Sequence, residues 1–301
     1  MPVEHPHPLV SVPTDPSERL WRYMDFAKFV SLISKRQLFL SNLEVLATTD
    51  PHEGMLSQPN YRHRQWNTIA DLTPEEHSTM FYKEMAGEER RIQFESQKNS
   101  REFWARRRFY DRRTLLINCW HLNKFESAAM WAQYAAGGQG IAITSNFARL
   151  LESLRNSPQR TFLGLVKYLD WSGEAVDSSF GLPFSKRESF SYEKELRLVY
   201  WDLEVQEHVN AICGKLTSHM MDHLYRRIST EINWDMVEEE AARVPFKSGL
   251  YIPVDLETLV DEVYVSPTSA GWFHEVVQSV CELYGFPRIP VRSDLLSSPL
   301  R

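Results

Sequence analysis

The sequence predicts an α+β fold, with a mixed, mainly antiparallel sheet core, flanking helices and a helical insertion. Segments with strand character are scattered among helical ones, which favours α+β over a doubly wound parallel sheet. The chain contains neither GxGxxG nor the P-loop patterns GxxxxGKS and GxxxxGKT, so the Rossmann and P-loop folds lose their main support. Its 301 residues, 43% of them hydrophobic, are enough to form one large core.

The individual elements follow from local patterns. Apolar residues recur at helical spacing over 24–35 and alternate over 37–42, which predicts a helix followed by a short strand. Further strands are expected at 115–119, 140–144, 161–168, 193–201, 250–254, 262–265 and 288–292, and helices at 127–135, 147–155, 207–243 and 271–284.

Residues 20–301 are predicted to form a single domain. Two segments differ from the rest of the chain: one precedes this domain and one is inserted within it. Residues 1–19 are rich in proline and are expected to form a flexible N-terminal arm. Residues from about 56 to 113 are dense in Arg, Glu, Lys and Gln, and Thr73-Pro74-Glu75-Glu76 is typical of a helix start. We interpret this region as a helical insertion, or a lid over the main fold.

Composition and charge exclude several classes of protein. The formal net charge of −6 gives no global attraction to nucleic acid or anionic membrane. Cys119, Cys213 and Cys281 have no CxxC spacing and are expected to be buried thiols rather than a disulfide framework. No stretch is apolar for long enough to span a bilayer, and the start has no signal-peptide pattern. We therefore expect a soluble, cytoplasmic protein.

The insertion carries one basic cluster. It consists of Arg106, Arg107, Arg108, Arg112 and Arg113. A solvated helix face is the favoured interpretation, and contact with phosphate, including that of nucleic acid, is the alternative.

The first candidate site segment is Trp21-Arg22-Tyr23, at the head of the first expected helix. The planar guanidinium of Arg22 suits phosphate or carboxylate, and its aromatic neighbours can stack on a base or another ring. An arginine in an ion pair at the edge of the domain is the alternative.

The second candidate segment surrounds the expected helix 127–135. Ser127, Trp131 and Tyr134 fall near one helical face, at i, i+4 and i+7. His121, beside the preceding strand, could act as an acid, a base or a ring partner. The alternative is a helix that packs its aromatic residues into the core, which we expect for Trp131.

The third candidate segment is the expected strand 193–201. Because side chains alternate along a strand, Glu193, Glu195 and Arg197 are predicted to share one face. Simple ion pairs are the alternative. Val199 and Trp201 continue this face, and solvent would not favour them, so we expect a cleft.

Six blocks of sequence resemble a widespread bacterial domain family of unknown function. They include LWRYMDFAKFVSLISKRQLFLSN, CWHLNKFESAAMWAQYAAGGQGIAI and KRESFSYEKELRLVY, and the resemblance runs from about Leu20 to about Leu295. A second resemblance is to the ADP-ribosyltransferase superfamily, which typically has Arg or His on its first strand, an aromatic or Ser in the middle and Glu-x-Glu on a later strand. Arg22, Ser127, Tyr134 and Glu193-Lys194-Glu195 follow that order. The middle Ser-Thr-Ser motif is missing, and Arg22 lies in a very short extended stretch.

The second resemblance implies an enzyme that uses NAD as its substrate, as a transferase or glycohydrolase, in the setting of a bacterial toxin or anti-phage effector. Glu195 would stabilise the ribosyl cation and Glu193 would position the acceptor, whose identity the sequence does not indicate. Arg22 would hold the diphosphate or ribose, and Tyr134 or Trp131 would stack on nicotinamide. The predicted NAD site comprises Arg22, Tyr23, His121, Ser127, Trp131, Tyr134 and Arg197. We predict that Arg22, Glu193, Glu195 and Arg197 converge in one cleft.

Two other classes of function compete with this hypothesis. In a metal-dependent nuclease-like toxin, Asp50, Glu53, Glu193 and Glu195 would hold a cation and the basic cluster would contact phosphates. A helix cap is the favoured role for Asp50, and the sequence has no HExxH, so no metal is expected. The third class is a non-catalytic module that binds a nucleotide or peptide.

Overall fold

A computed structural model describes residues 3–4, 8–81, 85–134, 137–177, 180–211, 214, 239 and 242–297. The fold is α+β, as the sequence predicts, with a mixed and mostly antiparallel sheet flanked by helices. Most of the expected helix 207–243, and Cys213 with it, lies outside the described residues. No helix in the described ranges is both long enough and apolar enough to cross a membrane.

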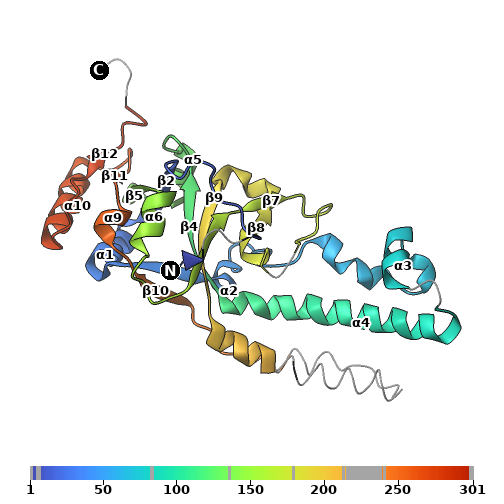
Figure 1. The fold of residues 1–301 in the computed structure, drawn as a ribbon. Coiled ribbons are helices and arrows are strands. Elements are labelled where there is room, and N and C mark those ends of the chain that lie inside the picture. The colour runs from blue at the N-terminus through green and yellow to red at the C-terminus, as the bar shows by residue number, and fades with distance from the viewer. Residues whose placement is uncertain are drawn as a thin grey trace.

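One large sheet forms the centre of the molecule (Figure 1). Its strands are β1 (Val3–Glu4), β2 (Arg19–Asp25), β3 (Gln37–Asn42), β4 (Leu115–Leu122), β5 (Gly140–Asn146), β6 (Thr161–Leu165), β9 (Glu195–Trp201), β10 (Gly249–Pro253), β11 (Val263–Val265) and β12 (Val291–Arg292). They follow the order β1-β6-β9-β4-β2-β5-β11-β12, and a branch of β3 and β10 joins at β4. Neighbouring strands are antiparallel except for the two terminal pairs, β1–β6 and β11–β12. A separate parallel pair is formed by β7 (Lys167–Leu169) and β8 (Ser185–Arg187).

Helices flank this sheet and extend from it. They are α1 (Phe26–Lys35), α2 (Leu43–Leu46), α3 (Pro74–Met80), α4 (Gly87–Asp111), α5 (Ala128–Tyr134), α6 (Phe147–Ser153), α9 (Leu256–Leu259) and α10 (Gly271–Leu283), with 3₁₀ helices at Gln58–Gln65, Ile69–Asp71, Arg112–Thr114, Leu182–Phe184 and Glu188–Glu193. The first begins later than its apolar pattern predicts because Asp25 caps it, accepting a hydrogen bond from the Lys28 amide at 2.8 Å. The strand before it is correspondingly longer, so Arg22 lies in the middle of β2.

The sheet forks at β4. One edge of this strand pairs with β9 along its whole length. The opposite edge pairs with β3 near its start and with β2 near its end. Between these two pairings, residues 118–120 have no backbone pairing on this edge within the described part of the chain. The Asn118 side chain reaches across, and its Nδ2 donates a hydrogen bond to the Phe39 carbonyl at 2.8 Å. The fork separates β2 from β3, which α1 connects.

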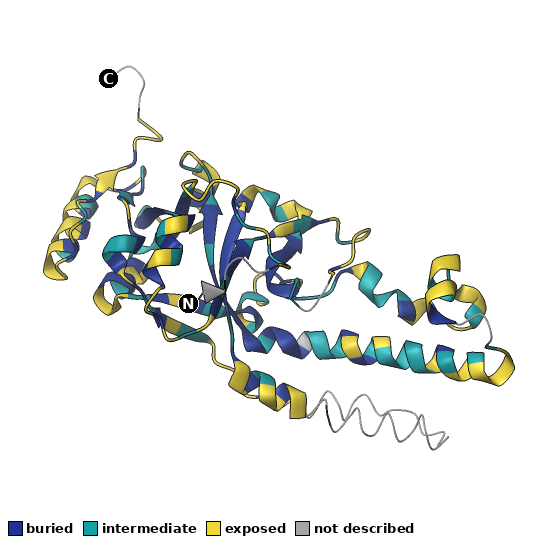
Figure 2. Cartoon of the chain, viewed as in Figure 1, coloured by how far each residue is buried: buried dark blue, intermediate teal, exposed yellow. Residues whose placement is uncertain are grey.

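Side chains on opposite faces of the sheet form two cores. Figure 2 shows that the central strands of the sheet are largely buried. Leu196 and Leu198 of β9 pack with α1, α6 and α10 in the larger core. Val199 and Trp201, on the other face, belong to a smaller core with β7 and the 3₁₀ helix that precedes β8. The predicted alternation of apolar residues along this strand is confirmed. Burial of each large apolar side chain contributes about 1.5–3 kcal/mol.

The insertion is helical, but it does not form a lid over the sheet. Its helix α4 runs away from the main body and lies beside α3 at its far end (Figure 1). A small separate core of Trp66, Met80, Phe81 and Phe94 holds this end together. Because these apolar residues are buried within the insertion itself, they do not have to pack on the sheet.

The N-terminal segment, predicted to be a flexible arm, packs against the edge of the sheet. Val3–Glu4 pairs with β6, and the Leu165 amide donates to the Ser11 carbonyl at 2.8 Å. A Cβ on Gly164 would lie 1.8 Å from a Val10 methyl, so the absence of a side chain there lets Val10 pack directly on the strand. The prolines indicate the irregular backbone of this segment but not its packing.

Candidate functional site

A cavity of about 540 Å³ opens at the fork of the sheet. Volumes of this order are typical of small-molecule sites. It is lined by six of the residues predicted for the site: Arg22, Tyr23, His121, Tyr134, Glu193 and Glu195. They come from β2, β4, α5, β9 and the 3₁₀ helix before β9, and meet only in the folded chain.

Arg22 is a cation without an acidic partner. Its side chain is half-buried in the cavity wall, and no hydrogen bond or ion pair to it is formed among the described residues. Burial lowers the pKa of this guanidinium to about 10, so it stays charged at neutral pH. Because an uncompensated charge is unfavourable in such a place, the cavity has a position suited to an anion.

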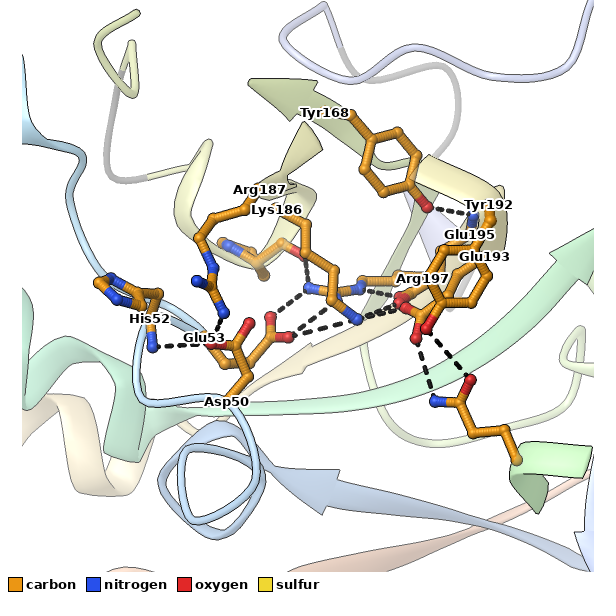
Figure 3. Close-up of polar contacts among 12 residues, drawn as sticks. Asp50, His52, Glu53, Tyr168, Lys186, Arg187, Tyr192, Glu193, Glu195 and Arg197 are labelled. Atoms are coloured by element: carbon orange, nitrogen blue, oxygen red, sulfur yellow. Dashed lines mark hydrogen bonds and ion pairs between the residues drawn. The ribbon is translucent and has the colours of Figure 1, made fainter. Parts of the chain in front are cut away.

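The carboxylates of the site belong to a buried ionic network with two bases (Figure 3). Lys186 Nζ contacts carboxylate oxygens of both Glu193 and Glu195, at 2.7 Å for the latter. Arg197 lies behind them, with Nε 2.5 Å from Glu195 Oε2 and Nη1 2.7 Å from Glu53 Oε1. All five side chains, that of Glu53 included, are at most 10% exposed. The network thus holds three acids against two bases.

The prediction that Glu193 shares a strand face with Glu195 and Arg197 is wrong. Glu193 ends the 3₁₀ helix Glu188–Glu193, and β9 begins only at Glu195. Between them Lys194 takes a left-handed conformation, with φ 41°, which redirects the chain into the strand. The two glutamates meet through this turn and through Lys186, not through strand periodicity.

The excess acid in the network determines which glutamate holds a proton. Although burial opposes ionisation, the positive charges of Arg197 and Lys186 hold the pKa of Glu195 well below its usual range. Burial, together with the neighbouring Glu195, raises the pKa of Glu193 to about 7. The site therefore pairs a permanently ionised carboxylate with one that titrates near neutral pH, an arrangement suited to acid–base chemistry.

His121 offers a second basic group. It lies within β4, which extends to Leu122 rather than ending before the histidine as predicted. Its Nδ1 donates to the Glu193 carbonyl at 2.6 Å, because a carbonyl oxygen can only accept. The other nitrogen, Nε2, is then an acceptor, and it is buried without a hydrogen-bond partner in the described structure. Burial lowers the pKa of this imidazole, so the neutral form is favoured.

Three residues of the predicted NAD site do not line the cavity. Ser127 contributes its backbone amide, which donates to Tyr23 Oη at 2.9 Å. Trp131 packs edge-on against Tyr23, with ring centroids 5.0 Å apart, and is buried as the alternative interpretation expected. Arg197 is 1% exposed and supports Glu195 from behind. Of the four residues predicted to converge, Arg22, Glu193 and Glu195 share the cavity and Arg197 does not.

Sequence reasoning missed other residues of the site. Lys186 lies on β8, in a segment for which no strand or helix was predicted, and no local pattern distinguishes it from a surface lysine. Cys119, expected to be a core thiol, is half-buried and lines the cavity, where burial raises its pKa. Phe39 and Tyr251 also line it. For Phe39 the sequence contained one signal: on the alternating strand 37–42 it lies on the face opposite Leu38 and Leu40, so it was expected to point away from the core.

The acids of the nuclease hypothesis are engaged by cations of the protein. Asp50 accepts from the His52 amide at 3.1 Å and pairs with Arg187 at 2.8 Å. Glu53 pairs with Arg197. Within the described ranges, no three His, Cys, Asp or Glu side chains are grouped so that they could hold a metal ion. Asp50 caps a turn rather than a helix.

The arginines of the insertion are paired with acids rather than forming a simple solvated face, and contact with phosphate stays a prediction. Arg106 pairs with Glu102 at 2.6 Å, and Arg108 with Asp111 at 2.7 Å. The remaining pairs are Arg107–Asp111 at 3.5 Å, Arg113–Glu44 at 3.4 Å and Arg112–Glu44. Each arginine of the cluster thus contacts an acid of α4 or α2, and three acids (Glu44, Glu102 and Asp111) serve the five arginines.

No family model, curated protein or solved structure matches the chain. The two resemblances seen in the sequence therefore stay predictions, and the chemistry of the cavity carries the functional interpretation.

Proposed function

We propose that the chain is an NAD-using enzyme of the ADP-ribosyltransferase type, with its active site in the cavity at the fork. The observation that carries the proposal is the presence of Arg22, a cation with no acidic partner among the described residues, in the same cavity as the ionised Glu195. NAD offers an anionic diphosphate for the first and a ribose that becomes cationic for the second.

Charge explains how this arrangement would act. Cleavage of the bond between ribose and nicotinamide releases neutral nicotinamide and leaves positive charge on the ribose. Lys186 and Arg197 offset two of the three acids in the network, so one negative charge remains when Glu193 is ionised. That charge is held in a water-poor site and is already in place, which favours the cationic transition state over the ground state.

Glu193 would serve as the base for the incoming acceptor. A group with a pKa near the working pH both holds and releases protons readily. The acceptor's nucleophile would bond to the ribose carbon, and its proton would pass to Glu193. Gln133 Nε2 donates to Glu193 Oε1 at 3.2 Å, and Tyr192 Oη donates to Gln133 Oε1 at 3.3 Å. This relay links the carboxylate to a tyrosine that is 46% exposed, where an acceptor would enter.

Water as the acceptor would make the enzyme a glycohydrolase, and a macromolecule would make it a transferase. NAD is an intracellular metabolite, so we expect the activity in the cytoplasm. Consumption of NAD or modification of a macromolecule would suit a bacterial toxin or an anti-phage effector. The other two classes gain less support. Two acids of the nuclease hypothesis, Asp50 and Glu53, are paired with arginines. A module that only binds its ligand does not require a glutamate that titrates near pH 7.

The test is calorimetric titration of the purified chain with NAD, together with nicotinamide release, in chelator. Arg22→Gln removes the cation, and we expect NAD affinity to fall about tenfold or more, as for loss of a charge-assisted hydrogen bond. Arg19→Gln, at the exposed start of the same strand, is the matched control. Glu195→Gln should retain binding and abolish release.

Two results would contradict the proposal. One is the absence of saturable NAD binding at millimolar concentrations, a generous ceiling for a substrate site. The other is nicotinamide release that survives Glu195→Gln in a variant that still unfolds cooperatively.

A further inference from the structure

The cavity has a second, aromatic end. Phe39 of β3 and Tyr251 of β10 are register partners on adjacent strands, and both line the cavity. Their ring centroids are 5.0 Å apart, at an interplanar angle of 56°. The rings remain 40% and 37% exposed, although large aromatic side chains gain much from burial. They form a pair, the Phe39–Tyr251 pair, that is open to a ligand.

The position of this pair is fixed by its surroundings. A Cβ on Gly249 would lie 2.0 Å from the Phe39 ring, so the ring occupies the space that the missing side chain leaves. Tyr251 Oη lies 3.2 Å from Ser31 Oγ, and Lys35 Nζ sits 5.0 Å from the Tyr251 ring centroid. The rings are therefore prearranged, which reduces the ordering that binding requires.

Sheet geometry gives the distance between the two ends. Glu195 on β9 and Tyr251 on β10 are separated by β4 and β3, because β9 pairs with β4, β4 with β3 and β3 with β10. Three strand spacings correspond to roughly 14 Å. This is a minimum, because Phe39 lies beyond the last β3–β4 pair, Ser41–Ile117, where the two strands have separated. A single nucleoside does not bridge such a span. A ligand with a ring at each end, two sugars and a diphosphate between them does, and Arg22 enters the same cavity from β2 for the diphosphate.

We propose that the Phe39–Tyr251 pair is the subsite for the adenine base of a dinucleotide whose other end reacts at Glu195. This inference rests on the proposed function and assigns the orientation of NAD within the cavity. A purine presents a flat face that stacks on aromatic rings regardless of sequence context. Selectivity for NAD over nicotinamide mononucleotide then arises at this end of the cavity, far from the reacting bond.

The experiment compares two ligands in Tyr251→Ala and Phe39→Ala. Both variants should bind NAD about 5- to 150-fold more weakly, the range for loss of one base–aromatic stack. Nicotinamide mononucleotide, which lacks adenine, should bind them as tightly as it binds the native chain, and this unchanged affinity also shows that they fold. Tyr251→Phe keeps the ring and should keep most of the NAD affinity. Phe125→Ala, at a 68% exposed ring outside the cavity, is the matched control.

The outcomes separate this inference from the proposed function. If NAD binding depends on Arg22 but not on Phe39 or Tyr251, the adenine subsite is wrong and the proposed function stands. Equal weakening of both ligands also overturns the subsite, because the variants then act on the whole cavity. If the native chain does not bind NAD, both proposals fail.

Discussion

Replacement of Glu193 by Gln should remove a specific pH dependence of folding stability. The carboxyl is 2% exposed, and burial with the neighbouring Glu195 raises its pKa to about 7, against an ordinary value of 4.5. The folded chain therefore binds this proton more tightly than the unfolded chain does. The resulting stability is fully present below about pH 4.5 and is lost as the pH rises through 7.

The magnitude follows from the same two pKa values. Their difference corresponds to about 3 kcal/mol, of which about 2 kcal/mol falls between pH 5 and 8. Glutamine resembles the protonated acid and does not titrate. The free energy of unfolding of Glu193→Gln, taken relative to the native chain, should thus rise by about 2 kcal/mol over this window.

Urea denaturation at several pH values between 5 and 8 measures this difference directly. Burial lowers the pKa of His121, and its ring contacts the Glu193 carbonyl, which the substitution retains, so the contribution of this imidazole cancels. Glu188→Gln, exposed on the same 3₁₀ helix, is the control and should change the pH dependence little. Parallel stability curves for the native chain and Glu193→Gln would refute the assignment of the proton to this residue.

Three further predictions concern the same cavity. Arg22→Met should stabilise the unliganded chain by about 1 kcal/mol, because it removes a half-buried cation that has no partner in the described part of the chain; thermal unfolding measures this, and a lower midpoint would contradict it. Lys186→Met should destabilise the fold by about 3–5 kcal/mol at pH 8, since it leaves buried carboxylates uncompensated, and Lys167→Met, at an exposed position of β7, is the control. Nicotinamide release should rise with pH, with its midpoint at about pH 7 where Glu193 loses its proton, and a flat profile would exclude Glu193 as the base.

The sequence by itself determined the fold class and most of the elements. The helical spacing of residues 24–35 and the alternation over 37–42 predicted α1 and β3, and the alternation after Glu195 predicted the two faces of β9. These features depend on interactions between near neighbours, so their periods can be read along the chain. Six residues that line the cavity, among them Arg22 and Glu195, were also identified from their residue types.

Only the tertiary structure decided how those residues meet. The fork depends on the registers of β2 and β3 against β4, which are set by packing between segments far apart in the chain. No local sequence pattern indicates that Lys186 pairs with Glu193. Arg197 pairs with Glu53, which is 144 residues away in the sequence. Ion pairs of this kind form between whichever groups the folded chain buries together. Their partners, and the protonation that follows from them, therefore become visible only once the chain is folded.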